Sequence, residues 1–305
     1  MPENRRVADE VGYLLDNRQI EAGARFEALA TIFDPSTFRH IDNLGIAPGW
    51  ACWEVGAGGA SVPRWLAGRV GPTGRVLATD LDVSWVRTRD ATTGRDAAPP
   101  SARAGGATIA APAGEAFEVR RHDVGADPPP AGPFDLVHAR LVLVHVPARA
   151  AALASMVSVL RPGGWLLLED ADPALQPLIC PDEFGPEQRL ANRLRTGFRT
   201  LLAQRGADLE YGRTLPRRLR EAGLVDVAAD AYFPMTAPAS NRLEMATTLQ
   251  IRDQLLAGGL ATPDEIESYL ASIAAGRLDL ATAPMISAWG RRPPPDDRPP
   301  TNRAG

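Results

Sequence analysis

Residues 51–60, ACWEVGAGGA, are the most informative part of the chain for its architecture. Its first five residues form a short apolar run typical of a buried strand, and Gly56 and Gly58 follow where that run ends. Glycine adopts positive φ freely and has no β-carbon, so a ligand can approach the backbone closely at such a turn. A tight strand-to-helix turn needs the same residues, so the neighbouring segments must decide whether this one binds a ligand.

Short apolar runs recur along the chain and alternate with segments of helical periodicity. Six further strands are expected at residues 75–79, 117–121, 134–138, 164–169, 225–233 and 285–289. Helices are expected at residues 62–70, 147–160, 186–205 and 215–222. This alternation predicts an α/β fold: a doubly wound, mostly parallel seven-stranded sheet with helices on both faces. The two strands near the end of the chain indicate an antiparallel last strand.

The chain divides into a core and several helical additions. The expected parts are an N-terminal helical leader or lid (1–45), the core (46–172), a helical insertion (173–214), the C-terminal part of the sheet (215–291) and a disordered tail (292–305). In the leader, Asp34 and Pro35 are expected to start a second helix that ends at Gly45.

A helical pair is expected over residues 240–277, inserted into the C-terminal part of the sheet. Thr262 and Glu265 form a capping box before its second helix. The leader and the inserted helices would form a cap over the carboxyl ends of the strands. Residues 91–114 are rich in Ala, Gly, Pro, Ser and Thr, which predicts a disordered loop within the core.

Bulk composition narrows the classes of partner. The chain has 305 residues, of which 45% are hydrophobic and 23% charged, and no apolar run is long enough to span a membrane. Without a visible secretory signal, we expect a soluble cytoplasmic protein. A net charge of −4 gives the chain no overall positive electrostatic field with which to hold nucleic acid. The two cysteines, Cys52 and Cys180, predict core thiols rather than disulfides or a metal site. No oligomeric state is predicted.

Acidic residues end the next two strands. Asp80 follows the glycines by about twenty residues, where a carboxylate can accept hydrogen bonds from both hydroxyls of a ribose. Asp123 ends the third strand, where it could accept from an adenine amino group while Val124 packs on the ring. Either acid alone could be a helix N-cap. The glycines after the first strand, Asp80 at the end of the second and Asp123 at the end of the third together predict a ligand with an adenosine part.

These motifs resemble those of the class I S-adenosylmethionine-dependent methyltransferases. EVGAGGA (54–60) is similar to the family's ExGxGxG motif, with Ala60 in place of the last glycine. The segments ATDLD (78–82), HDV (122–124) and FDLVH (134–138) resemble the ends of the second and third strands and the fourth strand. LRPGGW (160–165) is similar to the LxPGG turn before the fifth strand. The likeness covers residues 45–172 and, more loosely, 215–290.

The resemblance implies S-adenosylmethionine as cofactor, with S-adenosylhomocysteine as product. The glycines would pass beneath its methionine part, Asp80 would hold the ribose, Asp123 and Val124 would flank the adenine, and Glu54 would order the glycine loop. The cofactor-binding residues implied in this way are Glu54, Gly56, Ala57, Gly58, Asp80, Leu81, Asp123, Val124, His138, Ala139 and Arg140. The last three would border the sulfonium and the methyl acceptor.

Methyl transfer from a sulfonium depends mainly on holding the acceptor in line with the methyl group. A base is needed only if the acceptor carries a proton, and His138 and His145 are the candidate catalytic residues, although each could instead be a structural histidine. Glu169, Asp170 and Asp172 could orient the acceptor or bind a cation.

The acceptor is expected to be a small, partly apolar molecule. The fourth strand ends in HARL rather than in an Asn/Asp-Pro-Pro-Tyr motif, which counts against nucleobase and glutamine amino-methylation. The helices of the cap are rich in Leu, Phe, Met and Tyr, which indicates a partly apolar pocket. O-methylation is favoured, and N- or C-methylation is possible.

Two other functions fit part of this pattern. An NAD(P)-dependent oxidoreductase would also use the glycine loop and Asp80, but Ser61 stands where its fingerprint has a third glycine and the antiparallel last strand is unusual for it. A non-catalytic scaffold that retains the cofactor fold is the other alternative.

Overall fold

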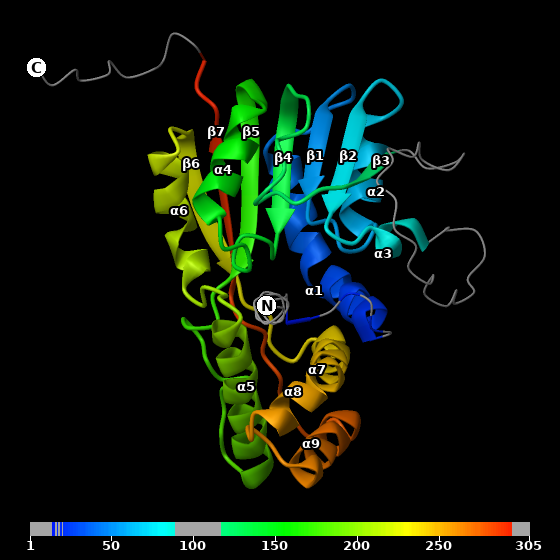
Figure 1. Ribbon diagram of the computed structural model, residues 1–305, viewed down its shortest axis with the longest axis vertical. Coiled ribbons are helices and arrows are strands. Elements are labelled where there is room, and N and C mark those ends of the chain that lie inside the picture. Colours follow the sequence, from blue (N-terminus) through cyan, green and yellow to red (C-terminus); the bar gives the residue numbers. More distant parts are fainter. Residues whose placement is uncertain (1–13, 16, 18, 20, 89–116, 295–305) are drawn as a thin grey trace, which may run out of the picture.

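The computed structural model describes residues 14, 15, 17, 19, 21–88 and 117–294. Its centre is a seven-stranded sheet in the order β3-β2-β1-β4-β5-β7-β6 (Figure 1). The strands are β1 (Ala51–Val55), β2 (Arg75–Asp80), β3 (Glu118–Arg121), β4 (Phe134–Arg140), β5 (Leu160–Ala171), β6 (Val225–Tyr232) and β7 (Met285–Arg291). Strands β1 to β5 pair in parallel, and β7 is antiparallel to both β5 and β6. The predicted sheet and its antiparallel last strand are confirmed.

Helices cover both faces of the sheet, as the alternating strand pattern requires. On one face, α4 (Arg149–Ser158) and α6 (Tyr211–Glu221) pack against a core that includes Trp53 and Leu168. On the other, α2 (Ser61–Val70) and α3 (Ser84–Thr88) pack against a core that includes Cys52. Trp53 and Cys52 are neighbours in β1 and point to opposite faces because side chains alternate along a strand.

The order of the strands creates a topological switch point at the carboxyl ends of β1 and β4. From β1 the chain moves outward to β2 and β3, and then returns to the other side of β1 as β4. Parallel α/β sheets bind ligands at such a topological switch point. The glycine turn after β1 and the loop after β4 therefore lie at the same switch point.

A helical cap lies beyond the carboxyl ends of the strands (Figure 1). It consists of α5 (Pro186–Gln204), α7 (Pro238–Gln250), α8 (Arg252–Ala257) and α9 (Pro263–Ala274), and has its own apolar core. The expected helical pair over 240–277 is in fact three helices. The capping box at Thr262 and Glu265 is confirmed, since each residue's side chain binds the backbone N–H of the other.

The N-terminal helix differs from the prediction. Helix α1 (Glu21–Asn43) is continuous and contains Pro35, so the expected second helix starting at Asp34 is wrong. The Asp34 carboxylate accepts a hydrogen bond from Arg140 of β4 at 2.8 Å instead of capping a helix. Helix α1 also packs along α7, and these tertiary contacts hold the helix together across its proline.

Three other predictions concern the loop, the tail and the cysteines. The loop at 91–114 lies outside the described residues, as do residues 295–305 of the tail. Arg292, which was expected in the tail, exchanges backbone hydrogen bonds with Gly163 and Gly164, so the ordered chain extends further than predicted. Cys52 and Cys180 are buried core thiols, as expected.

Candidate active site

The glycine loop after β1 is shaped by two left-handed residues. Gly56 has φ of 67° and Gly58 has φ of 55°, a region that side chains rarely adopt. A β-carbon on Gly56 would collide with Cγ2 of Val142, and one on Gly58 would lie 2.8 Å from Cε1 of Phe26. The loop after β4 and helix α1 therefore both pack directly on the glycine loop.

The backbone is strained just after β4, at the residue that precedes Val142. Leu141 is left-handed, with φ of 58°, although it is not a glycine. Its N–H donates to the carbonyl of Glu169 on β5 at 2.8 Å, which fixes the turn. Strain of this kind persists only where the surroundings enforce it and is concentrated at functional sites.

Asp80 connects the end of β2 to the glycine loop. Its Oδ2 accepts the N–H of Gly58 at 2.8 Å and its Oδ1 accepts the N–H of Asp82 at 3.0 Å. Burial raises the pKa of Asp80, and these backbone N–H groups oppose that rise. A carboxylate has about four lone-pair positions, so acceptor capacity remains on both oxygens. Next to it, Leu81 is 54% exposed.

The loop after β3 lies against the loop after β4. Asp123 is half-buried, and its Oδ1 accepts the N–H of Gly125 at 2.8 Å. A β-carbon on Gly125 would lie 3.0 Å from Cγ1 of Val146, which shows how close the two loops are. Val124 is buried in the core beneath them. The residues expected at the ends of β1, β2, β3 and β4 are thus brought to one edge of the sheet.

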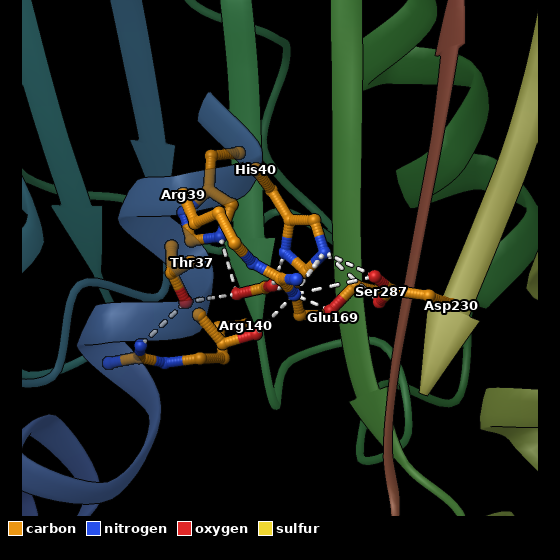
Figure 2. A network of polar contacts seen from close by, with 9 residues as sticks. Thr37, Arg39, His40, Arg140, Glu169, Asp230 and Ser287 are labelled. Atoms are coloured by element: carbon orange, nitrogen blue, oxygen red, sulfur yellow. Dashed lines mark hydrogen bonds and ion pairs between the residues drawn. The ribbon is translucent and has the colours of Figure 1, made fainter. Parts of the chain in front are cut away.

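Behind this edge lies a buried polar network centred on Glu169 of β5 (Figure 2). The Glu169 carboxylate is 1% exposed and accepts from the Ser287 hydroxyl at 2.7 Å and from the Thr37 hydroxyl. Its Oε1 lies 3.3 Å from Nδ1 of His40, and the other nitrogen of His40 lies 3.0 Å from Asp230. The network ties α1 to β5, β6 and β7.

His138 belongs to this network and is fully buried. Its Nδ1 lies 2.6 Å from Oε2 of Glu54 and its Nε2 lies 3.3 Å from Oε2 of Glu169. Desolvation alone would lower the pKa of His138, but the two carboxylates outweigh it and raise the pKa to about 9. Because both ring nitrogens are engaged by buried carboxylates, His138 does not fit the expected role of general base.

The side chains of Glu54 and Arg140 also lie behind the carboxyl edge of the sheet. Burial raises the pKa of Glu54, against the attraction of His138. Glu54 is two residues before Gly56, and its side chain binds His138. This arrangement is suited to ordering the glycine loop. Arg140 donates to Thr37 at 2.9 Å and to Asp34 at 2.8 Å, so its guanidinium holds α1 rather than facing the switch point. Ala139 is buried.

His145 is the expected catalytic residue that does lie at the edge. It is half-buried in the loop between β4 and α4. Burial, together with the nearby charges of Arg25 and Arg149, lowers the pKa of His145 to about 4. The imidazole is therefore uncharged at neutral pH and can accept a hydrogen bond.

The acidic residues at the carboxyl end of β5, Glu169, Asp170 and Asp172, have different surroundings from those expected. Glu169 is the centre of the network, and Asp172 forms two hydrogen bonds with the guanidinium of Arg213, at 2.7 and 2.6 Å. Neither carboxylate is available to an acceptor. Burial raises the pKa of Asp170 to about 8, and its Oδ1 has no hydrogen-bond partner. Within the described ranges, no three acidic, histidine or cysteine side chains are arranged to bind a metal ion.

No sequence motif indicates the other members of the network. Thr37, His40, Asp230 and Ser287 are separated from Glu169 by 61 to 132 positions in the chain, and none lies in a recognisable motif. An acid at the end of β5 was the nearest available clue. In the part of the chain that the structure describes, no helix is long and apolar enough to cross a membrane.

A family model for a methyltransferase domain matches residues 51–229. Among curated proteins, the nocamycin O-methyltransferase of Saccharothrix syringae is 29% identical over 88% of this chain and 98% of its own length. A ubiquinone/menaquinone biosynthesis C-methyltransferase of Hydrogenovibrio crunogenus is 31% identical over 47% of this chain. The chain spans 16% to 50% of the length of the first four curated relatives that it matches.

Solved structures share the fold at low sequence identity. A protein described as a methyltransferase of an antibiotic biosynthesis pathway from Anabaena variabilis has a TM-score of 0.54 and 14% identity, covering 85% of this chain and 98% of that one. A phosphoethanolamine N-methyltransferase from Haemonchus contortus, in complex with S-adenosylhomocysteine, has a TM-score of 0.50 and 12% identity, covering 90% of this chain and 58% of that one.

Proposed function

This chain belongs to the family of S-adenosylmethionine-dependent methyltransferase domains, and on that premise we propose that it methylates an oxygen atom of a small, partly apolar acceptor. The observation that carries the proposal is the meeting of the glycine loop, Asp80 and Asp123 at the switch point between β1 and β4.

The residues at this edge fit S-adenosylmethionine. Gly56 and Gly58 present bare backbone, Asp80 keeps acceptor capacity for the ribose hydroxyls, and Asp123 keeps one carboxylate oxygen for the adenine. The exposed Leu81 side chain is suited to packing against the adenosine. When bound, the cofactor supplies a methyl group that is already activated, so the protein contributes position and exclusion of water.

An apolar wall beside the edge supports a partly apolar acceptor. Ile32 and Phe33 of α1 pack with Ala239 of α7 and with Met285, the residue of β7 that pairs with the carboxyl end of β5. Leu141, at the strained turn after β4, joins this cluster. Nearby, Tyr232 is 37% exposed and lies edge-on to Phe33 with ring centroids 6.1 Å apart.

Two observations support oxygen as the acceptor atom. The curated relative whose length the chain covers almost completely is named an O-methyltransferase. The uncharged imidazole of His145 is able to accept the proton of a hydroxyl group as a hydrogen bond and so orient its oxygen. His145 is accordingly the proposed acceptor-orienting residue, in place of His138.

A turnover assay with three matched acceptors tests the proposal. A phenol, an arylamine and a 1,3-diketone of similar size offer oxygen, nitrogen and carbon to the same donor, and mass spectrometry locates the methyl group. We expect the O-methyl ether of the phenol as the main product. Methylation of only the amine or only the carbon would refute O-methylation, and cofactor binding without any product would favour the non-catalytic scaffold.

A further inference from the structure

Arg25 is a buried arginine that forms no ion pair with the residues that the structure describes. It lies on the second turn of α1 and is 4% exposed. One guanidinium nitrogen donates to the amide oxygen of Asn17 at 3.1 Å, and the group lies 4.8 Å from the centre of the Phe26 ring. Its Nε has no hydrogen-bond partner, and no carboxylate among the described residues forms an ion pair with it.

Three other poorly exposed arginines are compensated within the protein. Arg140 pairs with Asp34 at 2.8 Å and Arg195 lies 3.7 Å from Glu244, each with 12% of its side chain exposed. Arg149 donates to three backbone carbonyls. Burying a charge without compensation costs several kcal/mol by general estimates, so a buried guanidinium that no described carboxylate pairs with calls for a ligand.

The position of Arg25 places its charge at the edge where the cofactor-binding loops meet. The adjacent Phe26 ring covers Gly58, whose added β-carbon would lie 2.8 Å from Cε1 of Phe26. On the other side, Arg25 is close enough to His145 to lower the pKa of that imidazole. The guanidinium thus lies between the glycine loop after β1 and the loop after β4.

We propose that Arg25 binds a carboxylate of a molecule held at this edge. A guanidinium presents planar N–H donors that match the two oxygens of a carboxylate, and here Nε is free while Asn17 and Phe26 fix the plane. The inference rests on the proposed function. The carboxylate comes either from the amino-acid part of the cofactor, as the contact of Phe26 with Gly58 favours, or from an acidic acceptor.

Calorimetry with two nucleosides distinguishes the first source. S-adenosylhomocysteine carries the amino-acid carboxylate, whereas 5′-methylthioadenosine has the same adenosine thioether without it. We expect Arg25→Met to weaken S-adenosylhomocysteine binding on the order of ten- to a hundred-fold and to leave 5′-methylthioadenosine unchanged. Arg25→Lys, which keeps the charge, should retain part of the affinity. Arg217→Met, which removes an arginine with 58% of its side chain exposed on α6, should change neither.

A second titration tests the acceptor as the source. Benzoate is titrated into protein saturated with S-adenosylhomocysteine, and binding by the wild type that is lost in Arg25→Met assigns the carboxylate to the acceptor. Unchanged binding of all three ligands in Arg25→Met overturns the proposal. Equal weakening of both nucleosides also overturns it, because that result means a structural role for Arg25.

Thermal unfolding without ligand supplies an independent readout. Because Arg25→Met removes an unpaired buried charge, the ligand-free variant should unfold at the wild-type temperature or above it. A lower unfolding temperature would indicate that the charge is compensated within the protein and would contradict the proposal. If the wild type binds neither nucleoside, the proposed function fails, an outcome distinct from failure of the Arg25 assignment alone.

Discussion

Replacing Glu169 with glutamine should destabilise the protein more than a change of one atom suggests. The Glu169 carboxylate is 1% exposed and is surrounded by His40 and the hydroxyls of Thr37 and Ser287 (Figure 2). Its other neighbour is His138. A glutamine removes the negative charge and turns one acceptor into an N–H donor facing other donors. Breaking a buried ion pair from one side typically costs about 3 to 5 kcal/mol.

For a chain of this size, that loss corresponds to a fall in the unfolding temperature of roughly 6 to 20 °C. Urea unfolding of the wild type and Glu169→Gln measures the free energy directly. Glu221→Gln is the matched control: Glu221 pairs with Arg217 at the surface, with 58% of each side chain exposed, and should lose under about 0.5 kcal/mol.

The same network gives stability a dependence on pH. The pKa of His138 rises from 6.5 to about 9 on folding. Its contribution to the free energy of unfolding is therefore complete below pH 6.5 and is lost as the pH rises through 9. At 1.36 kcal/mol per unit, the contribution is about 3 kcal/mol. The pKa of Glu169 is lowered well below 4.5, so its contribution is present above pH 4.5 and is lost as the pH falls. A flat unfolding free energy between pH 6.5 and 9, or a loss below about 1 kcal/mol in Glu169→Gln, would refute this reasoning.

Three further changes have defined outcomes. Gly56→Ala places a β-carbon against Val142 at a left-handed position and should lower the free energy of unfolding in urea by about 1 to 3 kcal/mol. Adding Val142→Ala should restore part of this loss. No recovery in the double variant would mean that the contact is not the cause. Thr262→Ala removes a side-chain cap of α9 and should cost about 1 kcal/mol. His145→Gln should lower kcat for a phenol with little change in the KM for the cofactor. Because the pKa of His145 is about 4, the wild-type rate should not rise between pH 6 and 8, and a rise there would contradict the assigned state.

The sequence predicted the sheet because local and global signals agreed there. Buried parallel strands such as β1 and β4 are short apolar runs, and the helices between them show regular periodicity. The capping box at Thr262 was equally local. The glycine loop and Asp80 were found because their chemistry depends on positions close in sequence to strand ends.

The network and the N-terminal helix could not be predicted in the same way. Pro35 and Asp34 form a local helix-start signal, which is overridden because Arg140, 106 residues away, binds Asp34. His138 was placed at the switch point by its position at the end of β4, but the alternation of β4 directs its side chain toward Glu54 and Glu169. Arg25 resembles any surface arginine of a helix until α1 is packed on the sheet.

Calorimetry with S-adenosylhomocysteine and NADH tests whether S-adenosylmethionine binds where the glycine loop and Asp80 meet. The wild type should bind S-adenosylhomocysteine with a dissociation constant in the micromolar range and should not bind NADH. Asp80→Ala should abolish the binding, whereas Asp253→Ala, at an exposed position on α8, should retain it. Equal affinity in Asp80→Ala and the wild type, or binding of NADH alone, would contradict this placement of the cofactor.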